Sequence, residues 1–89
     1  MALYAVSFRR SAEKDLHKLD DAMQSRVLET VEGLASNPRP WGFRKLQGRR
    51  REDAFRIRVG DYRIIYTVDD GTKAVTVERV RHRREVYRE

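Results

Sequence analysis

The spacing of apolar residues changes along the chain and marks off successive predicted strands and helices. Near the start, Tyr4, Val6 and Phe8 alternate with smaller residues, which predicts a short strand with one apolar face. Apolar residues then recur every three or four positions, which is the spacing of a helix face. Two such stripes follow each other, formed by Ala12, Leu16 and Leu19 and then by Met23, Val27, Val31 and Leu34.

Polar residues at the ends of these stripes set the expected helix boundaries. Ser11 is a suitable N-cap for the first helix. The two aspartates at 20–21 separate the helices and cap the second one, with Gln24 placed as in a capping box. Pro38 ends the second helix, because the residue before a proline is pushed out of the helical region.

Residues 54–66, with the sequence AFRIRVGDYRIIY, predict a β-hairpin around the pair Gly60-Asp61. Two alternating segments flank a two-residue turn, so the turn fixes the register. The predicted pairs are Val59 with Tyr62, Arg58 with Arg63, Ile57 with Ile64 and Phe55 with Tyr66. The apolar members then share one side of the hairpin, and the arginines at 56, 58 and 63 share the other.

A second turn at Asp70-Gly71 predicts a third antiparallel strand. Its register would place Val75 beside Tyr66, Val77 beside Ile64 and Glu78 beside Arg63. The order of elements predicts an α+β fold: a two-layer β-α-α-β-β-β arrangement with an antiparallel sheet and the two N-terminal helices packed on one face. With 89 residues in all, we expect residues 1–89 to form a single domain.

Residues 37–53, NPRPWGFRKLQGRRRED, show no clear period and predict a long basic connection before the hairpin. A loop of this length in a small domain is usually functional or mobile. We expect Trp41, Phe43 and Leu46 to anchor the connection to the core, with stacking on a nucleic-acid base as the alternative for Trp41.

Positive charge is concentrated in the second half of the chain. Residues 1–38 carry five basic and six acidic side chains, whereas residues 39–89 carry fifteen basic and eight acidic ones, so the net charges are −1 and +7. Thirteen of those fifteen are arginine, whose planar guanidinium suits phosphate better than the ammonium of lysine. This bias is typical of a surface for a polyanion, with nucleic acid the leading candidate and a solvated charged face the alternative.

The position of the arginines favours phosphate binding over simple solvation. Like charges directly opposite each other destabilise a sheet, and the predicted register places Arg58 opposite Arg63. The basic tail and the basic connection adjoin the same small sheet in sequence. A phosphodiester bound there would relieve the repulsion.

Several other kinds of chemistry are not indicated. The chain has no cysteine, so it has no disulfide or thiolate zinc site. Metal-binding, phosphate-loop and Ser/His/Asp patterns are also absent, and we expect no metal and no cofactor. No apolar run approaches 18 residues and the start does not resemble a signal peptide, so we expect a cytoplasmic protein that does not bind membranes.

The arginine-rich tail contains two groups that can transfer protons, the imidazole of His82 and the phenol of Tyr87. Together with arginines, these are suitable parts for cleaving RNA through its own 2′-hydroxyl. That reaction needs proton removal from the hydroxyl, stabilisation of the anionic phosphorane and proton delivery to the leaving oxygen.

The segments NPRPWGFRKLQG, RIRVGDYRIIYTVDD and HRREVYR together resemble the RelE/StbE branch of the RelE/ParE toxin superfamily. The resemblance covers essentially the whole chain and implies a RelE-like fold and a toxin of a type II toxin–antitoxin pair. It further implies a metal-independent, ribosome-dependent endoribonuclease that cleaves mRNA in the ribosomal A site, contacts 16S rRNA and inhibits translation. A small RelB-like antitoxin is the implied protein partner.

The same resemblance implies roles for individual residues. Arg63 matches an arginine that grips the scissile phosphate, and Tyr87 matches a tyrosine that stacks on or orients the substrate. The second catalytic arginine is Arg83 when counted forward from Tyr66, and Arg81 when counted back from the tail. The implied catalytic residues are Arg56, Arg58, Arg63, Arg83 and Tyr87, and the implied substrate-binding residues are Arg81, His82 and Lys45.

Two other functions remain as alternatives at this point. The first is a ParE-like toxin that inhibits a topoisomerase by protein contact and has no nuclease activity. The second is a plain nucleic-acid-binding module or a toxin that has lost its activity. Retention of the arginines and of Tyr87 favours the nuclease.

Overall fold

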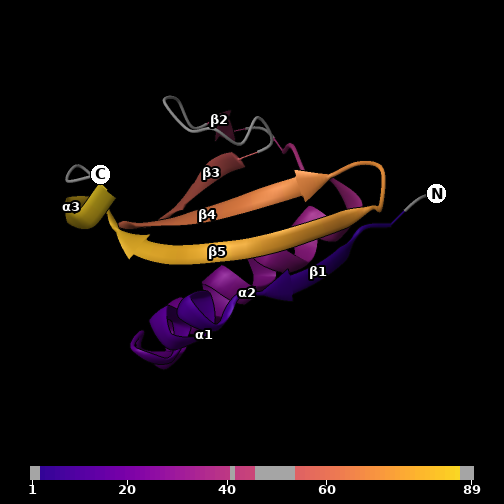
Figure 1. Cartoon of the computed structure of the whole chain (residues 1–89). Coiled ribbons are helices and arrows are strands. Elements are labelled where there is room, and N and C mark those ends of the chain that lie inside the picture. Colours follow the sequence, from indigo (N-terminus) through magenta and orange to yellow (C-terminus); the bar gives the residue numbers. More distant parts are fainter. Residues whose placement is uncertain (1–2, 41, 46–53, 87–89) are drawn as a thin grey trace.

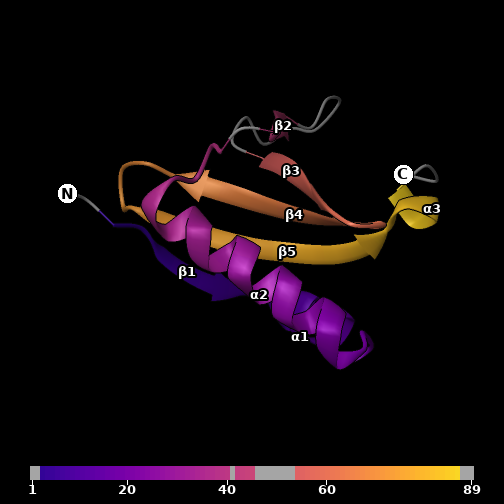
Figure 2. The ribbon, with the colours of Figure 1, turned by 180° about the vertical axis from the view of Figure 1, so that it is seen from behind.

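The computed structural model describes residues 3–40, 42–45 and 54–86. Its strands are β1 (Ala5–Phe8), β2 (Arg44–Lys45), β3 (Ala54–Val59), β4 (Tyr62–Asp69) and β5 (Ala74–His82), and its helices are α1 (Arg10–His17), α2 (Asp21–Ser36) and α3 (Arg83–Val86). The strands form one sheet, and α1 and α2 cover one of its faces (Figures 1 and 2). The predicted α+β, two-layer fold is confirmed.

The sheet has the order β1-β5-β4-β3-β2 and is mixed. The three long strands, β3, β4 and β5, are antiparallel as predicted. Strand β1 joins the far edge and runs parallel to β5. The short strand β2 extends the other edge by pairing with β3. Two residues are too few to give an alternating pattern, so the sequence did not predict β2.

The predicted register of the β3–β4 hairpin is confirmed at every pair. Gly60 adopts a φ of +59°, in the left-handed region that favours glycine. A Cβ at this position would also lie 3.2 Å from the Cε atom of Met23. The turn therefore needs glycine for its backbone conformation, and a side chain here would crowd the end of the Met23 side chain of α2.

The predicted register between β4 and β5 is wrong. Tyr66 pairs with Val77, two residues beyond the predicted partner, because a four-residue connection at 70–73 replaces the predicted two-residue turn. Lys73 makes this connection possible with a φ of 57°. A bulge then shifts the register by one more residue, so that Arg63 lies opposite Arg81 and not Glu78.

The core lies between α2 and the sheet. Val27, Val31 and Leu34 of α2 are buried as predicted, against a sheet face that includes Ile64 and Tyr66. The hydroxyl of Tyr66 donates a hydrogen bond of 2.8 Å to the carbonyl of Pro38, and burial raises the pKa of Tyr66 to about 12. The end of α2 is thereby attached to the middle of the sheet.

The predicted aspartate cap of α2 is right, but the predicted cap of α1 is wrong. The predicted capping box is also wrong, because the Gln24 side chain donates to the carbonyl of Leu19 at 3.0 Å. The side chain of Asp20 accepts the Met23 N–H at 2.8 Å, and α2 ends one residue before Asn37. Ser11 lies inside α1, whose N-cap position is Arg9. The Ser11 hydroxyl instead bonds to strand β5.

A cluster of three side chains joins the start of the chain, the segment after α2 and the β4–β5 connection. Arg39 donates two hydrogen bonds to the carboxylate of Asp70, at 2.9 and 3.2 Å, and the hydroxyl of Tyr4 donates a third at 2.6 Å. The bonds from Arg39, followed by the bond from Tyr4, lower the pKa of Asp70 to about 2. The cluster fixes the direction in which the chain leaves α2 towards β2.

We expect Asp70→Asn to lower the free energy of unfolding at neutral pH but to have little effect near pH 2. The pKa of Asp70 in the folded protein lies below its ordinary value of 3.8, so the ionised group stabilises the fold above about pH 4. That contribution is lost as the pH falls towards the folded pKa. Urea unfolding across this pH range measures it, with Asp61→Asn as an exposed control. A difference that does not change with pH would contradict this account.

Candidate functional site: an arginine-lined groove

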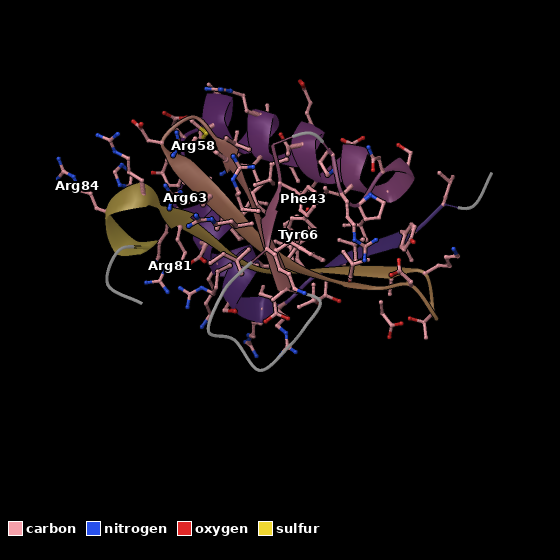
Figure 3. The ribbon with its side chains drawn as sticks, turned by 90° about the horizontal axis from the view of Figure 1, so that it is seen from above. Phe43, Arg58, Arg63, Tyr66, Arg81 and Arg84 are labelled. Atoms are coloured by element: carbon pink, nitrogen blue, oxygen red, sulfur yellow. The ribbon has the colours of Figure 1, made fainter. Side chains whose placement is uncertain are left out.

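The face of the sheet opposite α1 and α2 carries rows of arginines. The register places Arg58, Arg63 and Arg81 side by side on β3, β4 and β5. Arg44 and Arg56 form a second, adjacent row on β2 and β3. Figure 3 shows Arg58, Arg63 and Arg81 grouped near the hairpin end of the sheet. We call the five residues Arg44, Arg56, Arg58, Arg63 and Arg81 the arginine face.

Part of the arginine face is concave. A groove of about 280 Å³ lies over the hairpin and is lined by Gly42, Arg44, Arg56, Arg58 and Arg63. Gly42 has a φ of +96°, a conformation that disfavours side chains, and nothing within 4 Å would meet a Cβ there. Its role is therefore to let the backbone turn into β2. We call this concave region the arginine groove.

The arginines of the groove differ in exposure. Arg58 is exposed and Arg56 is half-buried, but only 6% of the surface of Arg63 is exposed. The alternation correctly placed Arg63 on the outer face, where it is nonetheless almost completely enclosed. Arg63 still lines the groove, and a guanidinium that is enclosed in this way is preorganised for a ligand.

The tail places its candidate residues in different environments. Arg81 lies opposite Arg63 in the ladder and is half-buried. Arg83 begins α3 and is exposed, and its backbone N–H donates to the carbonyl of Asp61 at 2.8 Å. This bond holds the start of α3 against the hairpin turn. Of the two alternatives for the second arginine, Arg81 is the one that the ladder aligns with Arg63.

His82 alternates with Arg81 along β5 and therefore lies on the helix side of the sheet. Its ring packs edge-on against Tyr62, with the ring centroids 5.2 Å apart. The Nδ1 atom of His82 accepts the Arg84 N–H at 3.3 Å. The structure thus does not bring His82 into the arginine groove. Tyr87 lies outside the described residues.

The connection before the hairpin contributes a residue that sequence reasoning missed. Arg44 lines the groove, whereas the predicted Lys45 is exposed and pairs with Phe55 in the ladder. Adjacent residues of a strand point to opposite faces, so Arg44 shares the face of Arg56 and Lys45 does not. Phe43 anchors the connection as predicted, at 5.5 Å from the ring of Phe55. The other two predicted anchors, Trp41 and Leu46, lie outside the described residues.

Within residues 3–40, 42–45 and 54–86, no three His, Cys, Asp or Glu side chains are grouped closely enough to hold a metal ion. Over the same part of the chain, no helix is both long and apolar enough to span a bilayer. The side chains that line the arginine groove are all arginines, so the site offers guanidinium groups. These groups donate hydrogen bonds to anionic oxygens.

The fold and the groove together define a class of protein: a small two-layer α+β protein with a basic groove on the open face of its sheet. The family model that matches residues 6–87 is that of the ParE toxin of the type II toxin–antitoxin system parDE. The chain therefore belongs to the RelE/ParE superfamily of type II toxins and, by its relatives, to the RelE-like members.

Two curated relatives come from Mycobacterium tuberculosis. Toxin RelG is 36% identical over 85 residues, which cover 96% of this chain and 97% of that protein. Toxin RelE is 33% identical over 86 residues, which cover 96% of this chain and 87% of that protein. The match therefore extends over nearly all of each protein.

Solved structures agree with this assignment. The toxin–antitoxin complex RelBE2 of M. tuberculosis contains a chain with a TM-score of 0.80 and 35% identity, covering 92% of this chain and 93% of that one. The RelE–RelB complex of Pyrococcus horikoshii contains one with a TM-score of 0.80 and 32% identity, covering 93% and 97%. The likeness thus includes both the fold and a substantial share of the sequence.

Proposed function

We propose that this toxin is an endoribonuclease that cleaves mRNA in the A site of the ribosome. The observation that carries the proposal is the arginine groove, in which four arginines from β2, β3 and β4 surround a space of about 280 Å³. An RNA phosphodiester in this groove would find guanidinium donors on several sides. The naming of relatives as RelE and RelG toxins supports the same function.

The proposed reaction uses the RNA itself as the nucleophile. The 2′-hydroxyl loses its proton and attacks the adjacent phosphorus, the bond to the 5′-oxygen breaks, and that oxygen gains a proton. The products are a 2′,3′-cyclic phosphate and a 5′-hydroxyl. Arg63, enclosed in the groove, would stabilise the negative charge that develops on the phosphorane.

The groove arginines would act on charge and not on protons, because arginine is not deprotonated in proteins. Arg56 and Arg58 therefore stabilise the transition state in this proposal. Arg81 would add a further cation beside Arg63. Proton transfer is left to other groups, among which the phenol of Tyr87 is the candidate from the sequence.

We further propose a RelB-type antitoxin as the protein partner. Two of the similar structures are described as complexes of a RelE-type toxin with its antitoxin, from M. tuberculosis and P. horikoshii. The mRNA, held on the ribosome with its 16S rRNA, is the proposed second partner. This substrate places the activity in the cytoplasm.

Primer extension on an mRNA translated in a purified system tests the proposal. Wild-type toxin should produce cuts in frame with codons in the ribosomal A site, and Arg63→Met should produce few or none. Loss of DNA supercoiling without RNA cuts would instead identify a topoisomerase inhibitor. If Arg63→Met cuts RNA as strongly as the wild type, the arginine groove is not the site of cleavage.

A further inference from the structure

A bulge in β5 determines which face of the sheet Arg81 occupies. Glu78 is the extra residue, because the cross-strand pairs with β4 on either side of it skip this position. If the register before the bulge continued, Val80 would pair with Arg63, and Arg81 would lie beside Tyr62 on the helix side. The bulge instead buries Val80 in the core, where only 4% of it is exposed, and turns Arg81 to the arginine face.

Helix α1 contacts β5 at this same point. Strand β1 pairs with β5 only as far as Val77. Beyond it, the hydroxyl of Ser11 donates to the carbonyl of Glu78 at 3.1 Å, and the carboxylate of Asp15 accepts the Val80 N–H at 2.9 Å. Side chains of α1 thus satisfy backbone groups of the strand edge where β1 stops.

Asp15 also holds the side chain of the residue that directly follows the bulge. It is 9% exposed, and it accepts two further hydrogen bonds from Arg79, one from Nε at 2.8 Å and one from Nη2 at 3.1 Å. Burial alone would raise the pKa of Asp15, but the bonds from Arg79 and from the Val80 N–H lower it below its ordinary value. An ionised carboxylate therefore holds the two residues that follow the bulge.

We propose that Asp15 is a positioning residue for Arg81, holding β5 in the bulged register that keeps Arg81 on the arginine face opposite Arg63. Ser11 assists by fixing the carbonyl of the bulged residue itself. The inference rests on the proposed function, in which Arg81 contacts the RNA. The competing explanation is that Asp15 only fastens α1 to the sheet.

Measuring the effect of Asp15→Asn on cleavage in the wild type, in Arg81→Ala and in Arg58→Ala separates these explanations. Asp15→Asn keeps the shape of the side chain and removes its charge. We expect it to lower single-turnover mRNA cleavage by about 10-fold, the size expected for weakening hydrogen bonds to a charged group. With Arg81→Ala already present, the same change should have no further effect, whereas with Arg58→Ala it should again cost about 10-fold. A helix anchor would give the same loss in all three backgrounds, which would overturn the proposal.

A second measurement does not depend on catalysis. Binding of a short RNA oligonucleotide by the free toxin should weaken with Asp15→Asn. In the Arg81→Ala variant, the same substitution should leave the affinity for RNA unchanged. Amide exchange at Val80 should accelerate, while exchange at Ile64 in β4 stays slow. If wild-type toxin cuts no mRNA but Asp15→Asn weakens RNA binding only when Arg81 is present, the proposed function is wrong and the positioning role of Asp15 is supported.

A milder variant covers the case in which Asp15→Asn does not fold. Ser11→Ala removes only the bond to the bulged carbonyl, and it should show the same dependence on Arg81 with a smaller loss. Faster exchange at Val80 with unchanged cleavage and unchanged RNA binding, in either variant, would overturn the proposal.

Discussion

Arg63→Met should lower the rate of mRNA cleavage by about 10²–10³-fold, the loss seen when one preorganised donor to a developing anion is removed. Arg63 is the most enclosed of the groove arginines, with 6% of its surface exposed. Its guanidinium therefore needs little reorganisation when charge develops on the phosphorus. Methionine retains the apolar stem that packs on the sheet, so the substitution removes the charge with limited loss of packing.

Single-turnover cleavage on programmed ribosomes measures this effect. Arg10→Met is the matched control, because Arg10 is an exposed arginine of α1 and its loss changes the net charge by the same amount. Thermal melts establish that both variants are folded at the temperature of the assay. Equal losses in both variants would attribute the effect to overall charge, and cleavage at the wild-type rate by Arg63→Met would remove Arg63 from the site.

The β3–β4 hairpin could be predicted residue by residue because independent requirements agree there. The turn needs a glycine with positive φ at Gly60, and the sequence has one. The alternation then places Ile57 and Ile64 towards the core and Arg58 and Arg63 away from it. Any one-residue slip would reverse these faces, so the pattern specifies a single register.

The β4–β5 register could not be predicted in the same way. A shift of two residues leaves every side chain on the same face, so the alternation before the bulge fits both the predicted and the observed pairing. The deciding residue is Lys73, a non-glycine residue with positive φ that the sequence does not mark. Three valines with unequal spacing, Val75, Val77 and Val80, are the only trace of the bulge in the pattern.

The arginine groove was predicted in part for related reasons. Arg58 and Arg63 follow from the hairpin, whereas Arg44 depends on a two-residue strand that has no pattern of its own. The resemblance to a family supplied the tail residues but left Arg81 and Arg83 as alternatives. The bulge in β5 determines which residue lies opposite Arg63, and that residue is Arg81.

This geometry predicts that Arg81 matters more than Arg83. Arg81 is half-buried in the row that contains Arg58 and Arg63, and a third guanidinium there would lie along the same phosphate backbone. Arg83 is exposed on α3, and its hydrogen bond to Asp61 uses the backbone N–H, which substitution of the side chain leaves in place. Exposed cations contribute mainly screened, longer-range attraction to an anion.

Arg81→Ala should therefore lower single-turnover cleavage by about 10²-fold or more, as expected for a donor aimed at the reacting phosphate, whereas Arg83→Ala should have a much smaller effect. The effect of Arg83→Ala should also diminish with increasing salt, because it reflects exposed charge. The two variants have the same net charge and lie two residues apart, so each is the control for the other. A larger loss for Arg83→Ala would mean that α3 moves over the groove when RNA binds. The row formed by Arg58, Arg63 and Arg81 would then not be the set of residues that acts in catalysis.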